Sequence, residues 1–230
     1  MEKLQAGILS KLTEDGASLV GFADIRELPA NIRHTMRSAI SIAAALDTDI
    51  VSEIIEGPTK RYHEEYVRIN GFLTGLCERT VEYLGHHGVE AVAIAPTIKK
   101  VDYKSLQTPL PHKTVATRAG LGWIGKSALL ITKQYGPAVR LASVLCDIEF
   151  ETADPINESH CGECTECVDR CPATAIKGNN WEAGSEREMI YNARQCYTMA
   201  KKLSGVIGVT STICGICIAA CPYTQRYLKR

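Results

Sequence analysis

The sequence predicts an α/β (or α+β) fold, with a larger domain at residues 1–154 followed by a small cysteine-rich domain at residues 155–230. Three observations support this prediction. Apolar runs of strand length are mixed with helical patterns through the first part of the chain. Eight of the ten cysteines lie after residue 160. Asp154-Pro155 and the polar stretch that follows form the expected boundary.

The larger domain is expected to contain both strands and helices. Strands are predicted at residues 18–25, 38–46, 89–95, 127–132 and 138–146. Helices are predicted at residues 2–15, 59–86 and 112–119, and a polar loop at 97–111. The alanines of 38–46 would equally suit a helix. The segment 59–86 has the strongest signal, because its apolar residues recur every three or four positions.

The late cysteines form two runs and one isolated residue. The first run has the spacing C-x2-C-x2-C-x3-C-P, and the second has C-x2-C-x3-C-P. The first spacing matches the bacterial ferredoxin pattern for [4Fe–4S] ligation, in which the fourth cysteine serves the other cluster. One cluster is therefore predicted to take Cys161, Cys164, Cys167 and Cys221. The other is predicted to take Cys171, Cys196, Cys214 and Cys217, where the isolated Cys196 supplies the ligand that the second run lacks.

Disulfides and zinc are the alternatives for these cysteines. Disulfides are typical of small secreted chains, whereas zinc sites use pairs of C-x2-C and not a triple followed by C-P. The spacing therefore favours iron–sulfur clusters. Cys77 lies beside the apolar face of 59–86 and Cys146 inside an apolar run, so both are expected to pack as small core residues.

The composition is that of an ordinary globular protein, with 45% hydrophobic and 23% charged residues. Basic and acidic residues balance at 26 each, so the net charge gives no general attraction to nucleic acid. No apolar run reaches the length of a membrane span, and the N-terminal residues do not resemble a signal peptide. We therefore expect a cytoplasmic protein that does not enter a membrane.

Residues 120–127, G-L-G-W-I-G-K-S, fit two nucleotide-binding patterns at once. They match G-x-G-x-x-G of dinucleotide sites and G-x-x-x-x-G-K-S/T of phosphate-binding loops. Both patterns need a strand before the glycines and a long helix after them, because the helix N-terminus holds the phosphate. The expected order here is the reverse, which disfavours ATP and nicotinamide dinucleotides. A ligand loop and a tight turn that caps a core tryptophan, Trp123, both stay open.

The chain resembles the epoxyqueuosine reductases and, more distantly, the cobalamin-dependent reductive dehalogenases. The resemblance is carried by A-G-L-G-W-I-G-K at 119–126, by Tyr62-His63 and by the order of the two cysteine runs. It implies a nitroreductase-like, cobalamin-binding domain and two [4Fe–4S] clusters that reduce the cobalt. The residues that it implies for the corrinoid site are His63, Lys113, Gly120, Gly122, Trp123, Gly125 and Lys126.

Three departures from this family pattern are visible. The acid of the family's D-Y-H segment is Arg61 here, and the position of its proton-donating aspartate holds Leu106. A Glu-Arg pair of the family becomes His112-Lys113, which makes His112 a candidate proton donor because histidine titrates near neutrality. A solvated loop histidine is the alternative. The family's C-terminal helical-repeat region, which helps to hold tRNA, is not expected in this chain.

These features predict an iron–sulfur oxidoreductase that passes electrons through two [4Fe–4S] clusters to a bound corrinoid, for a reductive reaction or for corrinoid reduction. A two-cluster electron carrier without a corrinoid, whose large domain could hold a flavin, and an epoxyqueuosine reductase acting on tRNA are the alternatives. The expected partners are an electron donor of the ferredoxin or flavodoxin type and a corrinoid protein or small-molecule substrate, but not tRNA.

Overall fold

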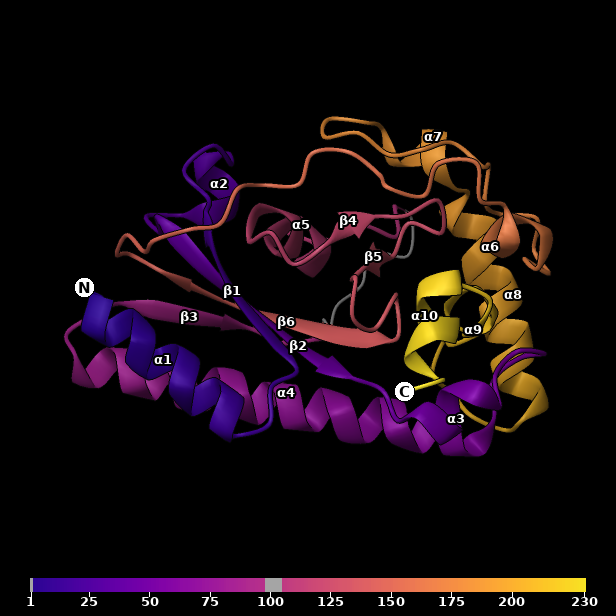
Figure 1. Cartoon of the computed structure of the whole chain (residues 1–230), viewed down its shortest axis with the longest axis horizontal. Coiled ribbons are helices and arrows are strands. Elements are labelled where there is room, and N and C mark those ends of the chain that lie inside the picture. Colours follow the sequence, from indigo (N-terminus) through magenta and orange to yellow (C-terminus); the bar gives the residue numbers. More distant parts are fainter. Residues whose placement is uncertain (1, 98–104) are drawn as a thin grey trace. The chain divides into compact units, whose positions relative to one another are not determined.

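The computed structural model describes residues 2–97 and 105–230 (Figure 1). The chain divides into two units. The first unit comprises Met1–Ala44, Ile69–Leu121 and Arg140–Ile156. The second unit comprises Ala45–Arg68, Gly122–Val139 and Asn157–Arg230. The polar loop expected at 97–111 lies partly outside the described residues.

The grouping of the chain differs from the expected division at residues 154 and 155. The last boundary between the units, at Ile156 and Asn157, lies close to the expected one. However, residues 45–68 and 122–139 group with the cysteine-rich region. Long-range hydrogen bonds explain this: the Leu46 amide donates to the Ala138 carbonyl at 2.9 Å, and the Tyr227 hydroxyl donates to the Leu46 carbonyl at 2.9 Å. The independent folding of 155–230 stays a prediction.

A four-stranded sheet with the strand order β1-β2-β6-β3 forms the centre of the first unit. The strands are β1 (Leu19–Asp24), β2 (Ser38–Ala45), β3 (Ala91–Ile94) and β6 (Val139–Cys146). β1 pairs antiparallel with β2, with Leu19 opposite Ala43, and β3 pairs antiparallel with β6. Nearly every residue of β2 is buried, because the sheet is covered on both faces. This burial explains why the alanine-rich segment is a strand.

Helices cover both faces of this sheet (Figure 1). They are α1 (Glu2–Glu14), α4 (Lys60–His86), α5 (His112–Arg118) and the short α2 (Ala30–Arg33). α1 and α4 lie along one face, and α5 lies on the other. α5 packs closely on β1 at Gly21, where a Cβ atom would lie 2.9 Å from the Ala119 carbonyl oxygen. Apolar residues of α5, such as Val115, then share a core with β-sheet residues such as Ala23 and Leu145.

The second unit consists of short elements. They are α3 (Thr48–Ser52), β4 (Trp123–Ile124), β5 (Leu130–Ile131), α6 (Glu166–Asp169), α7 (Arg187–Ile190), α8 (Ala193–Val206), α9 (Ile216–Ala219) and α10 (Pro222–Tyr227). One of its apolar clusters joins Ile124 and Ala128 of the hairpin to Trp181 and Ile190. Among the described residues, no helix has both the length and the apolar character that a membrane span requires.

The strand expected at residues 127–132 is shorter than predicted. Only Leu130–Ile131 is a strand, and it pairs antiparallel with β4 in a separate two-stranded sheet. The cause is a tight turn, in which the Ala128 amide donates to the Gly125 carbonyl at 2.8 Å and Ala128 has a φ of 59°. A residue in this left-handed region cannot continue a strand.

Candidate iron–sulfur site and the glycine loop

Short helices and tight turns carry the late cysteines. Cys167 lies on α6, Cys196 on α8 and Cys217 on α9, while Cys221 is the N-cap of α10. The turn between Cys214 and Cys217 needs glycine. Gly215 has a φ of 91°, and a Cβ atom there would lie 2.5 Å from the Ile54 side chain. The positive φ strains any larger residue here, and the contact with Ile54 adds to the cost.

The structure brings together the four cysteines expected at the first cluster, here called the first cysteine group. Cys161, Cys164, Cys167 and Cys221 line one cavity. Burial, and then the charges of Cys161, Cys221 and Cys164, raise the pKa of the Cys167 thiol to about 12. Thiolates so close together repel one another and therefore need a cation between them.

The other four cysteines, here called the second cysteine group, also lie together. They are Cys171, Cys196, Cys214 and Cys217. Burial, and then Cys171 and Cys214, raise the pKa of Cys196 to about 11. The pKa of Cys217 is raised by burial first and then by Cys214, Cys196, Cys167 and Cys171. Because Cys217 also lines the cavity of the first group, the two groups adjoin.

This donor set fits iron–sulfur clusters better than single ions. Within the described part of the chain, no three His, Cys, Asp or Glu side chains converge as ligands of one metal ion. A four-iron cubane is wider than one ion, so its thiolates stand farther apart. The thiols with raised pKa values would lose their protons to iron, since metal charge favours the thiolate.

The glycine loop is packed against its own hairpin. A Cβ atom on Gly122 would lie 2.1 Å from the Ile131 carbonyl oxygen, and one on Gly125 would lie 2.6 Å from the Ile131 side chain and 3.4 Å from the Cys161 sulfur. Gly120 has a φ of 68°, and its Cβ atom would lie 2.9 Å from the Ala153 side chain. The space beside these glycines is therefore filled by the protein itself.

The order of elements around the loop is the one that the sequence predicted. α5 precedes the glycines, and the two-residue strand β4 follows them. A phosphate-binding loop would need a strand first and a long helix next. The structure thus confirms the predicted order of elements. This order is not that of a dinucleotide fingerprint or a P-loop, although the sequence matches both patterns.

Trp123 and Lys126 are both buried in the second unit, 1% and 5% exposed. The Trp123 ring packs against His160 at a centroid distance of 5.0 Å and edge-on against Tyr223 at 5.1 Å. Its indole Nε1 has no hydrogen-bond partner among the described residues. The tryptophan is therefore a core residue, as one of the two open interpretations held. Sequence reasoning missed His160 and Tyr223, although both stand next to the cysteine motifs.

The residues expected at a corrinoid belong to both units. Gly122, Trp123, Gly125 and Lys126 lie in one hairpin of the second unit, whereas Lys113 and Gly120 belong to the first unit. The His63 Nε2 atom lies 3.0 Å from the Ser211 hydroxyl. The contacts of the three glycines and the burial of Lys126 show how the hairpin itself is packed. The corrinoid site at these residues stays a prediction.

His112 is held within the first unit. Its Nδ1 lies 2.9 Å from the Ser143 hydroxyl and its Nε2 lies 3.0 Å from the Ala95 carbonyl oxygen. Burial lowers the pKa of this imidazole. Both nitrogens are engaged by the protein, so these contacts favour a structural role over the expected proton donor. It is not the solvated loop histidine of the alternative either.

The two remaining cysteines lie in the core, as predicted. Cys77 is 1% exposed and Cys146 is fully buried. Burial raises the pKa of each thiol to about 12. Neither thiol lines the cavity of the cysteine groups. Thiols in such surroundings are inert, which is typical of small apolar core residues.

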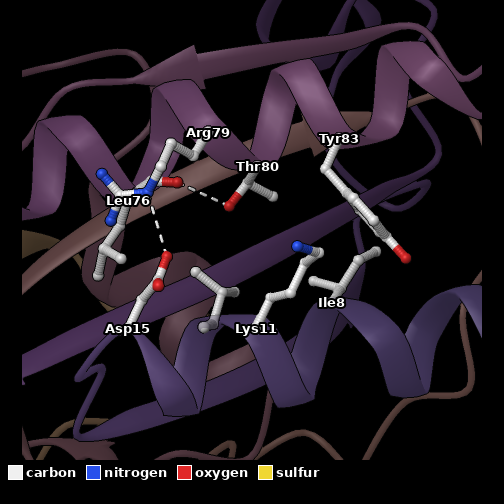
Figure 2. A pocket seen from close by; sticks show the side chains of 8 residues that line it. Ile8, Lys11, Asp15, Leu76, Arg79, Thr80 and Tyr83 are labelled. Carbon is white, nitrogen blue, oxygen red and sulfur yellow. Dashed lines mark hydrogen bonds and ion pairs between the residues drawn. The ribbon is translucent and has the colours of Figure 1, made fainter.

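A second cavity of about 80 Å³ lies between α1 and α4 in the first unit (Figure 2). Its polar side chains are engaged with one another. Arg79 pairs with Asp15 at 3.1 Å, and the Lys11 ammonium stands 5.2 Å from the centroid of the Tyr83 ring. This cavity contains no cysteine or histidine. It is a small cavity between packed helices and offers no ligands for a cluster.

Comparison with known proteins agrees with this site. Residues 160–224 match the family described as a 4Fe-4S double cluster binding domain. The epoxyqueuosine reductase of Lactococcus garvieae is 34% identical over 111 residues, which cover 48% of this chain and 31% of that protein. The epoxyqueuosine reductase of Staphylococcus aureus is 34% identical over 134 residues, which cover 57% of this chain and 35% of that protein. The chain thus spans about a third of these relatives.

Solved structures share the fold. An epoxyqueuosine reductase solved with an epoxyqueuosine-modified tRNA stem loop superposes with a TM-score of 0.65 at 22% identity, covering 97% of this chain and 66% of that one. A catabolic reductive dehalogenase superposes with a TM-score of 0.72 at 14% identity, covering 96% of this chain and 32% of that one. The predicted mixed α/β fold is therefore confirmed.

The fold and the matched domain define an iron–sulfur protein with a double [4Fe–4S] cluster binding domain. Within that class, the chain is a relative of the epoxyqueuosine reductases, as its motifs indicated.

Proposed function

We propose that this protein is an iron–sulfur oxidoreductase that passes electrons through two [4Fe–4S] clusters. The first cysteine group would hold one cluster and the second group the other. The observation that carries the proposal is the arrangement of eight cysteines in two adjoining groups, in which Cys217 lies near Cys167. Adjoining clusters suit electron transfer, because an electron needs to cross only a short gap between them.

The electron donor is proposed to be a small carrier protein of the ferredoxin or flavodoxin type. Such a donor gives up one electron at a time, and each cluster accepts one. The donor is oxidised by one electron when a cluster is reduced, and the cluster is reoxidised when the electron passes on. The chain's own contribution is to hold the thiolates, to exclude water and to set the potentials of the clusters.

A corrinoid is the proposed electron acceptor. The support for it is the sequence resemblance and the fold shared with a reductive dehalogenase described as carrying out B12-dependent dehalogenation. When bound, a corrinoid would supply the cobalt chemistry, and the protein would supply position and electrons. The glycine loop gives no support for the site of binding, because the chain's own atoms fill the space beside it.

A two-cluster electron carrier without a corrinoid is the second candidate. The observation that favours this candidate is the packing of the glycine loop. The hairpin with the A-G-L-G-W-I-G-K motif packs against the first cysteine group, with Gly125 close to Cys161. In that case, the role of the motif would be to pack against and hold the first cluster, and not to bind a corrinoid.

Action on tRNA is not proposed for this chain, although a structural neighbour was solved with a modified tRNA stem loop. Counted back without gaps from Gly120, the resemblance assigns the family's proton-donating aspartate to Leu106, which has no transferable proton. Binding of tRNA relies on cations that neutralise phosphates, and this chain has a formal net charge of +0.

Cofactor content of anaerobically purified protein tests these proposals together. Iron, cobalt and flavin should be measured per chain, before and after incubation with cobalamin. The proposal predicts about eight irons from two cubanes and about one bound cobalt. Eight irons without cobalamin binding in calorimetry would select the electron carrier. Well under eight irons after anaerobic reconstitution would contradict both.

A further inference from the structure

Lys126 is a cation buried in the cavity of the first cysteine group. The side chain is 5% exposed and lines the cavity together with Cys161, Cys164 and Cys221. Its Nζ donates a hydrogen bond of 3.0 Å to the main-chain carbonyl of Cys164. No ion pair between Lys126 and an acidic side chain is present within the described part of the chain.

A buried ammonium group requires a compensating negative charge. Lysine is almost never fully buried unless it is paired, since removal of an unpaired charge from water is costly. One neutral carbonyl oxygen does not supply that charge. A [4Fe–4S] cluster with four thiolate ligands does, because the assembly has a net negative charge that grows by one when the cluster is reduced.

The hairpin places this side chain at the cavity, and its close contacts require glycine. Gly122 lets β4 approach the Ile131 carbonyl, and Gly125 lets the chain pass beside Cys161 just before Lys126. The Gly125 amide donates to the Leu129 carbonyl at 2.9 Å. The turn is thereby closed, and Lys126 is fixed toward the sulfurs.

We propose that Lys126 is the charge partner of the cluster in the first cysteine group and that its ammonium raises the reduction potential of this cluster. This inference rests on the cysteine ligands proposed above. It replaces the expected role of Lys126 at a corrinoid. A positive charge stabilises the reduced, more negative cluster more than the oxidised one, and net charge is one of the factors that set the potential. Burial keeps water and salt from screening the effect.

Redox titration followed by electron paramagnetic resonance tests this inference. Lys126→Gln removes the charge and keeps a side chain that can donate to the Cys164 carbonyl. We expect the ratio of reduced to oxidised first cluster at a fixed potential to fall about tenfold or more, which corresponds to a shift of about 59 mV for one electron. The second cluster, of which only Cys217 lines the same cavity, should shift by less and serves as an internal comparison.

Two further variants separate charge from packing. Lys133→Gln removes an exposed lysine of the same unit and should leave both potentials unchanged. Lys126→Arg keeps the charge. If Lys126→Gln fails to assemble the first cluster, retention of that cluster in Lys126→Arg supports the charge role, and its loss there as well overturns it. An unchanged first potential in Lys126→Gln also overturns it. Absence of two clusters from the wild-type protein would instead refute the proposed function.

Discussion

The Nδ1 atom of His112 and the hydroxyl oxygen of Ser143 lie 2.9 Å apart. On the other side of the ring, Nε2 lies 3.0 Å from the Ala95 carbonyl oxygen. A carbonyl only accepts, so Nε2 holds a proton. Burial lowers the pKa of the ring and favours its neutral form, in which Nδ1 accepts from Ser143. The imidazole connects α5 to strand β6 and to the residue that follows β3.

Protonation of His112 should destabilise the protein. Burial lowers the pKa of His112 in the folded state, while an unfolded histidine titrates near about 6.5. The unfolded chain then binds more protons as the pH falls below about 6.5, so the free energy of unfolding should fall with it. NMR titration of the ring protons, assigned with His112→Gln, should give a midpoint below that value. A midpoint at or above it would contradict the structural role.

Substitution of Gly122 should disrupt the hairpin. A Cβ atom would lie 2.1 Å from the Ile131 carbonyl oxygen, and main chain cannot move aside as a flexible side chain can. Gly122→Ala should destabilise the protein by about 3 kcal/mol and should reduce the iron content, because the hairpin also carries Lys126. Unfolding by urea under anaerobic conditions, together with iron analysis, measures both effects.

Gly205→Ala is the matched control in the same unit. This residue lies in α8, and a Cβ atom there would meet nothing within 4 Å. Alanine should stabilise the helix by about 0.5–1 kcal/mol and leave the iron content unchanged. If Gly122→Ala behaved like Gly205→Ala, the close packing of the glycine loop would be refuted.

The chain should not reduce epoxyqueuosine in tRNA efficiently. Leu106 has a φ of 53°, a conformation that aspartate adopts more readily than leucine. The backbone should therefore tolerate Leu106→Asp. An anaerobic assay with a strong reductant, cobalamin and an epoxyqueuosine-bearing anticodon stem-loop compares the two proteins. Rapid queuosine formation by the wild-type chain would refute this prediction. Queuosine formation by Leu106→Asp alone would show that position 106 is where a proton donor is missing.

Local patterns predicted most of the first unit. The helix expected at residues 59–86 is α4, and the strand expected at 18–25 is β1. Each has a regular apolar face, which local sequence encodes. The two cysteine groups were also predictable, because the spacing of cysteines in a cluster motif reflects the geometry of the cluster that it binds.

Other features depend on contacts that local sequence does not encode. Residues 45–68 group with the cysteine-rich region through long-range bonds such as that between Tyr227 and Leu46. The sequence around Lys126 resembled a ligand-binding loop. Lysine is ordinarily exposed, so nothing in the sequence indicated that this one is buried. For His112, only the fold brings Ser143 and Ala95 to the ring.

The iron content of Cys196→Ala tests the central claim most directly. Cys196 stands apart from both cysteine runs, yet its pKa is affected by Cys171 and Cys214 of the second group. After anaerobic reconstitution the wild-type protein should carry about eight irons and the variant about four to seven, from loss or conversion of one cluster. Cys77→Ala, which changes a buried core thiol, should keep the wild-type content. A full complement of iron in Cys196→Ala, with the spectra of two intact [4Fe–4S] clusters, would contradict the assignment.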